Sequence, residues 1–201
     1  MLIKLWTRNN FEQLLLSLTL LAAVILSAHL LGEGVAAQGS SDKHVFLPII
    51  IKPVCPLNSE EQALADLLLN DANQQRTSLT CHPTLAQVAH QKAEDMAQRG
   101  YFSHTTPEGY GPNYLVRQAG YILPSYYDTA LDGNNIESIA AGYPTAAATW
   151  QQWMGSTPHR TQLLGLTSFF AEQTEYGIGY ASNPNSTYQY YWVAITAKPG
   201  P

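Results

Sequence analysis

The spacing of apolar residues predicts two amphipathic helices in the first half of the chain's main domain. Ser59 is expected to cap the first helix, because Glu60 and Glu61 follow it in the turn where carboxylates are favourable. Thr84 is expected to cap the second helix, which should end at Gly100. The apolar stripes of these helices are formed by Leu64, Leu67, Leu68 and Ala72, and by Leu85, Val88, Ala89, Ala93 and Met96.

Later segments predict shorter helices and a pair of antiparallel strands. Residues 176–182 and 188–196 are rich in β-forming side chains that alternate with smaller or polar ones, so they are expected to pair across a turn. The helices expected are residues 112–119, residues 144–154 and one that has Pro158 in its first turn. The shorter extended pieces expected are residues 121–123 and a piece that ends at Glu137 or Ser138.

The N-terminal residues 1–37 have the features of a secretory signal peptide. Lys4 and Arg8 precede a charge-free run over residues 14–31, and Val35 and Ala37 suit cleavage before Gln38. The run is close to the ~20 residues that span a bilayer, so an uncleaved N-terminal anchor is the alternative. In either case this segment contacts the membrane during export, and the mature protein is expected to be secreted.

Residues 38–58 are expected to form a linker, and residues 59–198 a single domain. The linker holds the apolar run of residues 45–51, interrupted by Pro48, which we expect to pack on the domain. The chain has a formal net charge of −5, and loss of the signal peptide would remove two charges of each sign. The basic footprint of a nucleic-acid-binding protein is therefore missing, and a monomeric, extracellular globule is expected.

Three titratable side chains lie among apolar or small neighbours and are the candidates for a site: His104, Glu137 and His159. Neutral imidazoles bind metals, and a carboxylate can complete a metal shell, orient a ring or act as a base. The two histidines are too far apart in sequence to form a local metal-binding motif, and each alone could be a hydrogen-bonded structural residue. His90 lies off the stripe of its helix and is expected to face solvent.

The order of these clusters resembles the CAP superfamily, which includes cysteine-rich secretory proteins, antigen-5 venom proteins and plant pathogenesis-related proteins. The resemblance extends from about Leu57 to Lys198. It implies an α+β fold, a three-layer α-β-α sandwich with a small, mostly antiparallel sheet. The segments that carry it are Phe102-Ser103-His104, Thr106-Pro107-Glu108-Gly109, Glu137-Ser138, Trp153-Met154, His159-Arg160, Gly177-Ile178-Gly179 and Tyr190-Tyr191-Trp192.

The resemblance places the family's cavity histidines at His104 and His159, and its cavity glutamate at Glu137. Many eukaryotic members have a second glutamate where this chain has Ser156. The family implies a divalent metal such as zinc, held by the two histidines with Glu137 nearby. A mechanism that needs two carboxylates is not expected here.

Two classes of function follow from the resemblance. The first is an extracellular binding module that recognises a lipid, a glycan or another protein. The second is a metal-dependent hydrolase with Glu137 as general base, although two protein ligands are fewer than a catalytic zinc site usually has. Ser103 and Ser156 lie in no nucleophile motif, so serine hydrolase chemistry is not favoured.

Cys55 and Cys81, the chain's two cysteines, flank the first helix. The segments on either side of that helix are long enough to fold back along it, so the thiols can meet. Because an oxidising compartment favours disulfides, we expect them to be joined, with two free thiols as the alternative.

Overall fold

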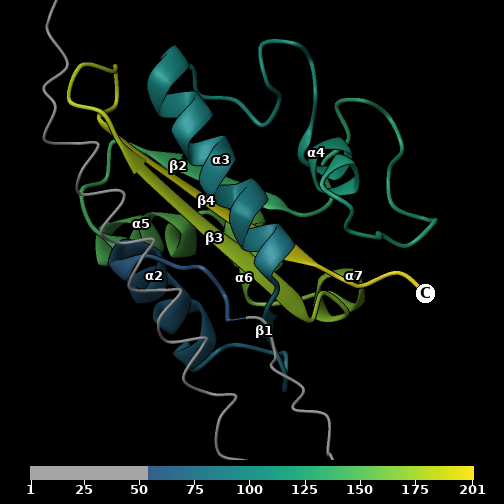
Figure 1. The fold of residues 1–201 in the computed structure, drawn as a ribbon. Coiled ribbons are helices and arrows are strands. Elements are labelled where there is room, and N and C mark those ends of the chain that lie inside the picture. Colours follow the sequence, from purple (N-terminus) through teal and green to yellow (C-terminus); the bar gives the residue numbers. More distant parts are fainter. Residues whose placement is uncertain (1–53) are drawn as a thin grey trace, which may run out of the picture. The chain divides into compact units, whose positions relative to one another are not determined.

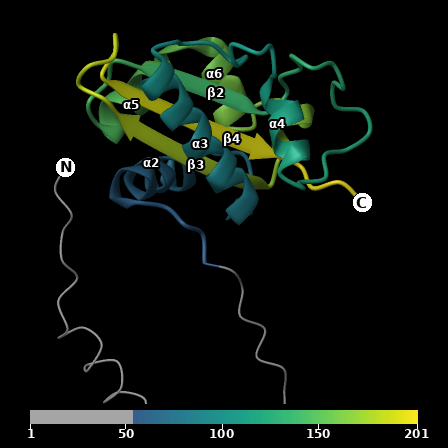
Figure 2. The same ribbon diagram turned by 45° about the horizontal axis from the view of Figure 1, so that its top comes forward.

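The computed structural model describes residues 54–201, which form one compact unit (Figures 1 and 2). The expected signal peptide, its cleavage site, the anchor alternative and most of the linker lie outside these residues. No helix within 54–201 is long and apolar enough to cross a membrane.

The centre of the domain is a four-stranded sheet with the order β1-β3-β4-β2. Strands β3 and β4 pair antiparallel, as do β4 and β2, whereas the short β1 runs parallel to β3. The bounds are Thr80–Cys81 for β1, Glu137–Ala141 for β2, Glu175–Ser182 for β3 and Tyr190–Ala197 for β4. The predicted antiparallel pair is confirmed, and the sheet is mostly antiparallel as expected.

Helices cover both faces of this sheet, so the predicted α+β fold with three α-β-α layers is confirmed (Figure 1). Alternate residues of β4 enter different cores: Val193 packs with α3 and Trp192 with α2 and α5. The bounds are Ser59–Asn70 for α2, Pro83–Arg99 for α3, Pro112–Gln118 for α4, Ala146–Gly155 for α5, Thr157–Leu163 for α6 and Ser168–Ala171 for α7.

The α3 helix lies directly on β3, at a distance that leaves no room for side chains there. A Cβ atom added to Gly177 or to Gly179 would come within 2.1 Å of the backbone of Leu85 or Ala89. Only glycine fits at both positions, because the obstructing atoms are backbone. At its far end, α3 stops at Gly100, whose φ of 69° lies in the left-handed region, as predicted.

Both predicted helix caps are displaced by one or two residues. The N-cap of α2 is Asn58 rather than Ser59, and its side chain accepts hydrogen bonds from the backbone of Glu60 and Glu61 while Glu61 closes a capping box. The N-cap of α3 is His82 rather than Thr84, because its Nδ1 accepts from the backbone N–H of Thr84. Pro83 at the first helical position requires the cap to precede it.

Of the two extended pieces expected between residues 121 and 143, the first is absent and the second has different bounds. Residues 121–123 form no strand, because Tyr121 N–H bonds back to Val116 and the carbonyl of Ile122 accepts from Gly200. The second piece, expected to end at Glu137 or Ser138, is the strand β2, which instead begins at Glu137. The partner strand β4 is long enough to pair with every residue of β2.

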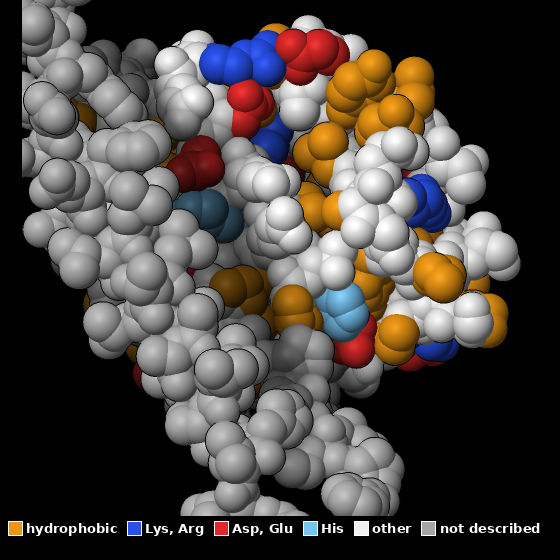
Figure 3. All heavy atoms as spheres, viewed as in Figure 1, with side chains coloured by type: hydrophobic (Ala, Val, Ile, Leu, Met, Phe, Trp, Pro, Cys, Tyr) orange, Lys and Arg blue, Asp and Glu red, His pale blue; other side chains and the backbone are white. Residues whose placement is uncertain are grey.

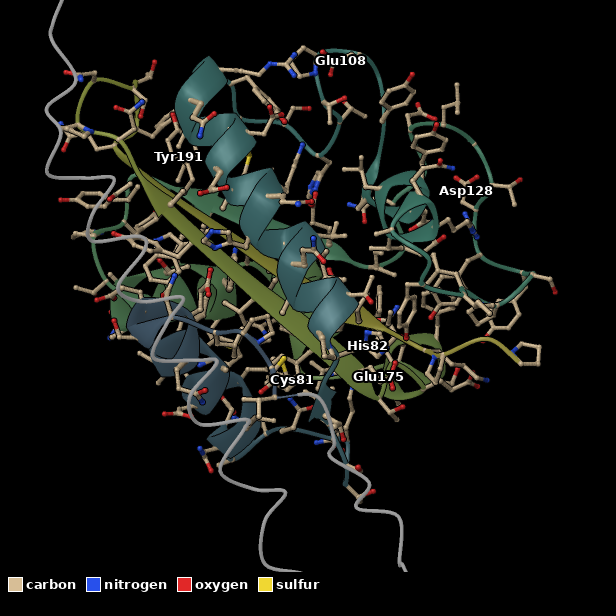
Figure 4. All side chains as sticks on the ribbon, viewed as in Figure 1. Cys81, His82, Glu108, Asp128, Glu175 and Tyr191 are labelled. Atoms are coloured by element: carbon tan, nitrogen blue, oxygen red, sulfur yellow. A yellow bond between two sulfur atoms is a disulfide. The ribbon has the colours of Figure 1, made fainter. Side chains whose placement is uncertain are left out.

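The loop after α3 is held to that helix by an ion pair on the surface. Arg99 contacts Glu108 at 2.6 Å and Asp95 at 3.3 Å. Figure 3 shows Lys or Arg side chains next to acidic ones at the top of this face, where Figure 4 labels Glu108. The ion pair is exposed, so it adds little to overall stability.

Candidate functional site

Three separate elements bring the predicted site residues to one cleft. His104 lies in the loop after α3, Glu137 is the first residue of β2, and His159 lies in the first turn of α6. A hollow of about 450 Å³ is lined by both histidines, and an adjoining one of about 350 Å³ is lined by both histidines and Glu137. The structure therefore gathers all three residues at one cleft.

Glu137 fixes the ring of His104. Its Oε1 lies 2.9 Å from Nδ1 of His104, and its side chain is 1% exposed against 43% for the histidine. The amide of Asn134 holds the backbone of Glu137 from both sides: Oδ1 accepts from its N–H at 2.9 Å and Nδ2 donates to its carbonyl at 3.3 Å. The carboxylate thus sits behind the ring and leaves Nε2 of His104 without a protein partner among residues 54–201.

His159 is fixed in a similar way by Ser156. Its Nδ1 lies 2.9 Å from Ser156 Oγ, and Ser156 is also the N-cap residue of α6. Burial lowers the pKa of His159, and the nearby His104 lowers it further. A lowered pKa favours the neutral ring, which can accept a proton or a metal ion.

The donor set fits a two-histidine metal site and does not fit a three-ligand site. Each ring has its Nδ1 engaged by a local partner, which leaves the two Nε2 atoms as the available ligands. Within the described part of the chain, no group of three His, Cys, Asp or Glu side chains could hold a metal ion. Glu137 contacts the Nδ1 side of His104 and leaves Nε2 of that ring free of its carboxylate.

Serine chemistry has little support in this cleft. Ser103 Oγ bonds only to Thr105 Oγ1, at 3.1 Å, and to the backbone of Thr105. Ser156 does contact a histidine, but no carboxylate among residues 54–201 contacts that ring in turn. The orienting third group of a catalytic triad is thus missing from the described residues.

Sequence reasoning missed a buried lysine beside the site. Lys92 on α3 is 3% exposed, and its Nζ donates to Tyr101 OH at 3.0 Å. Burial lowers the pKa of Lys92, while the charges of Glu137 and Asp95 oppose that effect. The signal was present, because Lys92 falls at helical spacing on the buried stripe between Val88 and Met96.

His90 was predicted to face solvent and does so only in part. Its Nδ1 lies 2.6 Å from Oε1 of Glu61, whose side chain is 1% exposed, and its Nε2 lies 3.4 Å from Glu94. The same Oε1 of Glu61 accepts from the backbone N–H of Tyr180. His90 therefore links α3 to α2 and to the edge of β3.

The expected disulfide is confirmed. Cys55 is joined to Cys81, which ties the segment before α2 to β1 (Figure 4). No free cysteine remains in residues 54–201.

Two solved structures that are similar to this chain come from bacteria. An extracellular protein containing an SCP domain from Bacillus anthracis is 22% identical, with a TM-score of 0.52, over 73% of this chain and 45% of that one. An outer surface protein from Borrelia burgdorferi is 15% identical, with a TM-score of 0.52, over 71% of this chain and 96% of that one. The chain thus spans less than half of the Bacillus protein, and at these identities the likeness establishes the fold alone.

A comparison with curated proteins gives no match. The family description "CAP: Cysteine-rich secretory protein family" matches residues 72–196, which include β1, the later helices and strands up to the last residue but one of β4, and every residue of the cleft. With the fold and the order of the site residues, this match establishes that the chain belongs to the CAP family of cysteine-rich secretory proteins.

Proposed function

We propose that this chain is an extracellular binding module whose cleft holds a divalent metal ion, such as zinc, between Nε2 of His104 and Nε2 of His159. The observation that carries the proposal is the engagement of both Nδ1 atoms, by Glu137 and by Ser156. Metal-binding histidines usually have their second nitrogen fixed in this way, because the contact sets the tautomer and the orientation of the ring.

A bound divalent ion would act as a Lewis acid that attracts an oxygen atom of the module's partner. The chain's own residues would orient that contact. Glu137 would hold His104 against rotation, and burial would keep His159 in its neutral form. With two protein ligands the ion would keep several open positions, which suits recognition of an external ligand.

An extracellular location is supported by the relatives and by the disulfide. The Bacillus relative is described as extracellular and the Borrelia relative as an outer surface protein. The bond between Cys55 and Cys81 is of a kind that persists mainly in oxidising compartments. A lipid, a glycan and another protein are all compatible with this role, and we expect the module to be a monomer.

A hydrolase with Glu137 as general base is the alternative, and the geometry favours it less. A general base must come within hydrogen-bond reach of the proton that it removes. The side chain of Glu137 is 1% exposed and already contacts His104, so it reaches the cleft mainly through that ring. We therefore favour binding over turnover.

The test is metal analysis and calorimetric zinc titration of the secreted protein, alongside peptide, ester and glycan hydrolysis assays. We expect one zinc site per chain, its loss in His104→Ala and in His159→Ala, and no turnover. Hydrolysis that disappears in Glu137→Gln while zinc is retained would replace the binding role with the hydrolase. Absence of zinc binding above pH 7 would contradict the proposed metal site.

A further inference from the structure

The strand β2 forms one edge of the sheet (Figure 2), and its residues from Ile139 to Ala141 line the cleft. Its inner side pairs with β4: the carbonyl of Ile136 accepts from Thr196, and Gly142 N–H donates to Tyr190. In an antiparallel pair, successive residues point their backbone groups to opposite sides. The N–H and C=O groups of residues 137, 139 and 141 therefore point away from β4.

Side chains of the domain satisfy part of this outer edge. Asn134 pairs with both backbone groups of Glu137, and Trp153 Nε1 donates to the carbonyl of Ile139 at 3.1 Å. Within residues 54–201, Ile139 N–H, Ala141 N–H and the Ala141 carbonyl have no hydrogen-bond partner. The unpaired groups are thus two donors and one acceptor, repeated at the two-residue period of a strand.

These groups line the cleft together with an unpartnered amide. Residues Ile139 and Ala141 form part of the wall of the 450 Å³ hollow, and Gln152 on α5 lines the same hollow. Oε1 of Gln152 is buried and makes no hydrogen bond within the described residues. Phe102, which is 43% exposed, lines the same hollow and adds an apolar surface that a ligand's side chain can contact.

We propose that an extended segment of a partner polypeptide binds in this cleft by pairing with the free edge of β2 as an additional strand. Ala141 would exchange both of its backbone hydrogen bonds with one residue of the segment, and Ile139 N–H would bond to a carbonyl two residues along. The inference rests on the proposed binding role of the cleft, and it is independent of the metal.

A peptide fits these groups better than the other ligand classes do. An exposed strand edge is a template for another strand, because a peptide backbone repeats donors and acceptors at the same period. A lipid has one polar head and cannot pair with groups at both Ile139 and Ala141. The hydroxyl groups of a glycan have no such period.

The test removes a single backbone donor at the edge. Ala141→Pro deletes the outward N–H without breaking a bond to β4, and proline is tolerated on edge strands. Ala141→Val keeps the N–H and is the matched control. The affinity of both variants and of the wild type is measured for soluble heptapeptides that give the strongest signals on a random heptapeptide array. The same affinities are measured for these peptides N-methylated at alternate residues.

We expect peptide affinity to fall by roughly tenfold or more in Ala141→Pro, as loss of one backbone hydrogen bond and its alignment implies, and to stay near wild type in Ala141→Val. N-methylation of the peptide should abolish binding when it falls on every second peptide residue, and not when it falls on the residues between them. This readout does not depend on how the protein variant folds. The amide signals of Ile139 and Ala141 in nuclear magnetic resonance spectra should shift when the peptide binds.

Strand pairing would be overturned if wild type and Ala141→Pro bind the peptides with equal affinity. It would also be overturned if the effect of N-methylation on binding does not alternate from one peptide residue to the next. Strand pairing would also be overturned if the amide signals of Ile139 and Ala141 shift when tri-N-acetylglucosamine or palmitate is added but do not shift with any peptide. Zinc titration of the same samples separates the two proposals. Zinc binding without any peptide binding contradicts strand pairing alone, whereas patterned peptide binding without zinc supports it and contradicts the metal.

Discussion

Glu137 Oε1 lies 2.9 Å from Nδ1 of His104, although 33 residues separate the two along the chain. The carboxylate is buried and the imidazole is partly exposed, so the contact holds the Nδ1 side of the ring and leaves Nε2 without a partner among residues 54–201. Glu137 would then act on a bound metal through His104, as an orienting residue.

This relationship predicts a graded response to mutation. Glu137→Gln keeps the size of the side chain but removes its charge, so zinc affinity should fall by about 10- to 100-fold, as is typical for loss of a partner behind a metal-binding histidine. Calorimetric titration measures the change. Complete loss of binding, equal to that of His104→Ala, would instead identify Glu137 as a direct ligand.

Ser156 should have a similar but smaller effect through His159. Its hydroxyl contacts Nδ1 of that ring at 2.9 Å, so Ser156→Ala should lower zinc affinity by roughly tenfold without abolishing binding. Ser103→Ala is the matched control, because Ser103 lines the same cleft and bonds only to Thr105. If the two variants bind zinc equally well, Ser156 does not orient the ring.

The sequence predicted the architecture well wherever a local pattern was strong. The stripe from Leu85 to Met96 and the β-forming run that contains Val193 each identified an element and its buried face. Periodicity could not locate the edges of these elements, because caps depend on side-chain contacts such as that of His82 with Thr84. It also missed β1, whose two residues are set by pairing with β3.

The site residues were found through family resemblance, since nothing local joins His104 to His159. Their partners were harder to predict. Ser156 was noted only as the replacement of a glutamate, whereas its hydroxyl contacts His159 in the structure. Lys92 was missed because a lysine on an apolar stripe is usually read as exposed, and its burial depends on Tyr101 in the following loop.

His90 predicts a pH dependence of stability. Burial acts to lower the pKa of His90, but its contacts with Glu61 and Glu94 outweigh this, so the pKa is raised above 6.5. A histidine that binds its proton more tightly in the folded state stabilises the fold below the unfolded pKa. That stabilisation is lost as pH rises through the folded pKa.

Urea unfolding of the wild type and His90→Gln measures this effect. The difference in free energy of unfolding should be largest below pH 6.5 and should shrink as pH increases above that value. A difference that stays constant from pH 5.5 to about 8 would show that the proton on His90 is not linked to folding.

The disulfide should account for a measurable share of stability. Cys55 and Cys81 are separated by 26 residues, so the chain-entropy relation gives on the order of 3 kcal/mol. Urea unfolding of the Cys55→Ser, Cys81→Ser double variant should show a loss of this size, and reductant should then have no further effect on it. A double variant as stable as the oxidised wild type would contradict the prediction.

Processing gives a prediction outside the described residues. Protein exported by a secretion-competent host should begin at or within a few residues of Gln38, and intact-mass measurement of the secreted material identifies the new N-terminus. Ala37→Asp should block cleavage, because a charged residue replaces the small one before the site. A wild-type protein that keeps residues 1–37 and fractionates with membranes would support the anchor alternative.

The central claim is that Nε2 of His104 and Nε2 of His159 bind one divalent ion. The most direct measurement is a zinc titration followed by the ring nitrogen signals of the histidines in nuclear magnetic resonance spectra. Nε2 of both rings should shift together up to one equivalent. The affinity should fall as pH drops below about 6.5, because protons compete for the same nitrogens. If neither ring responds above pH 7, or if only His82 or His90 responds, the account of the cleft is wrong.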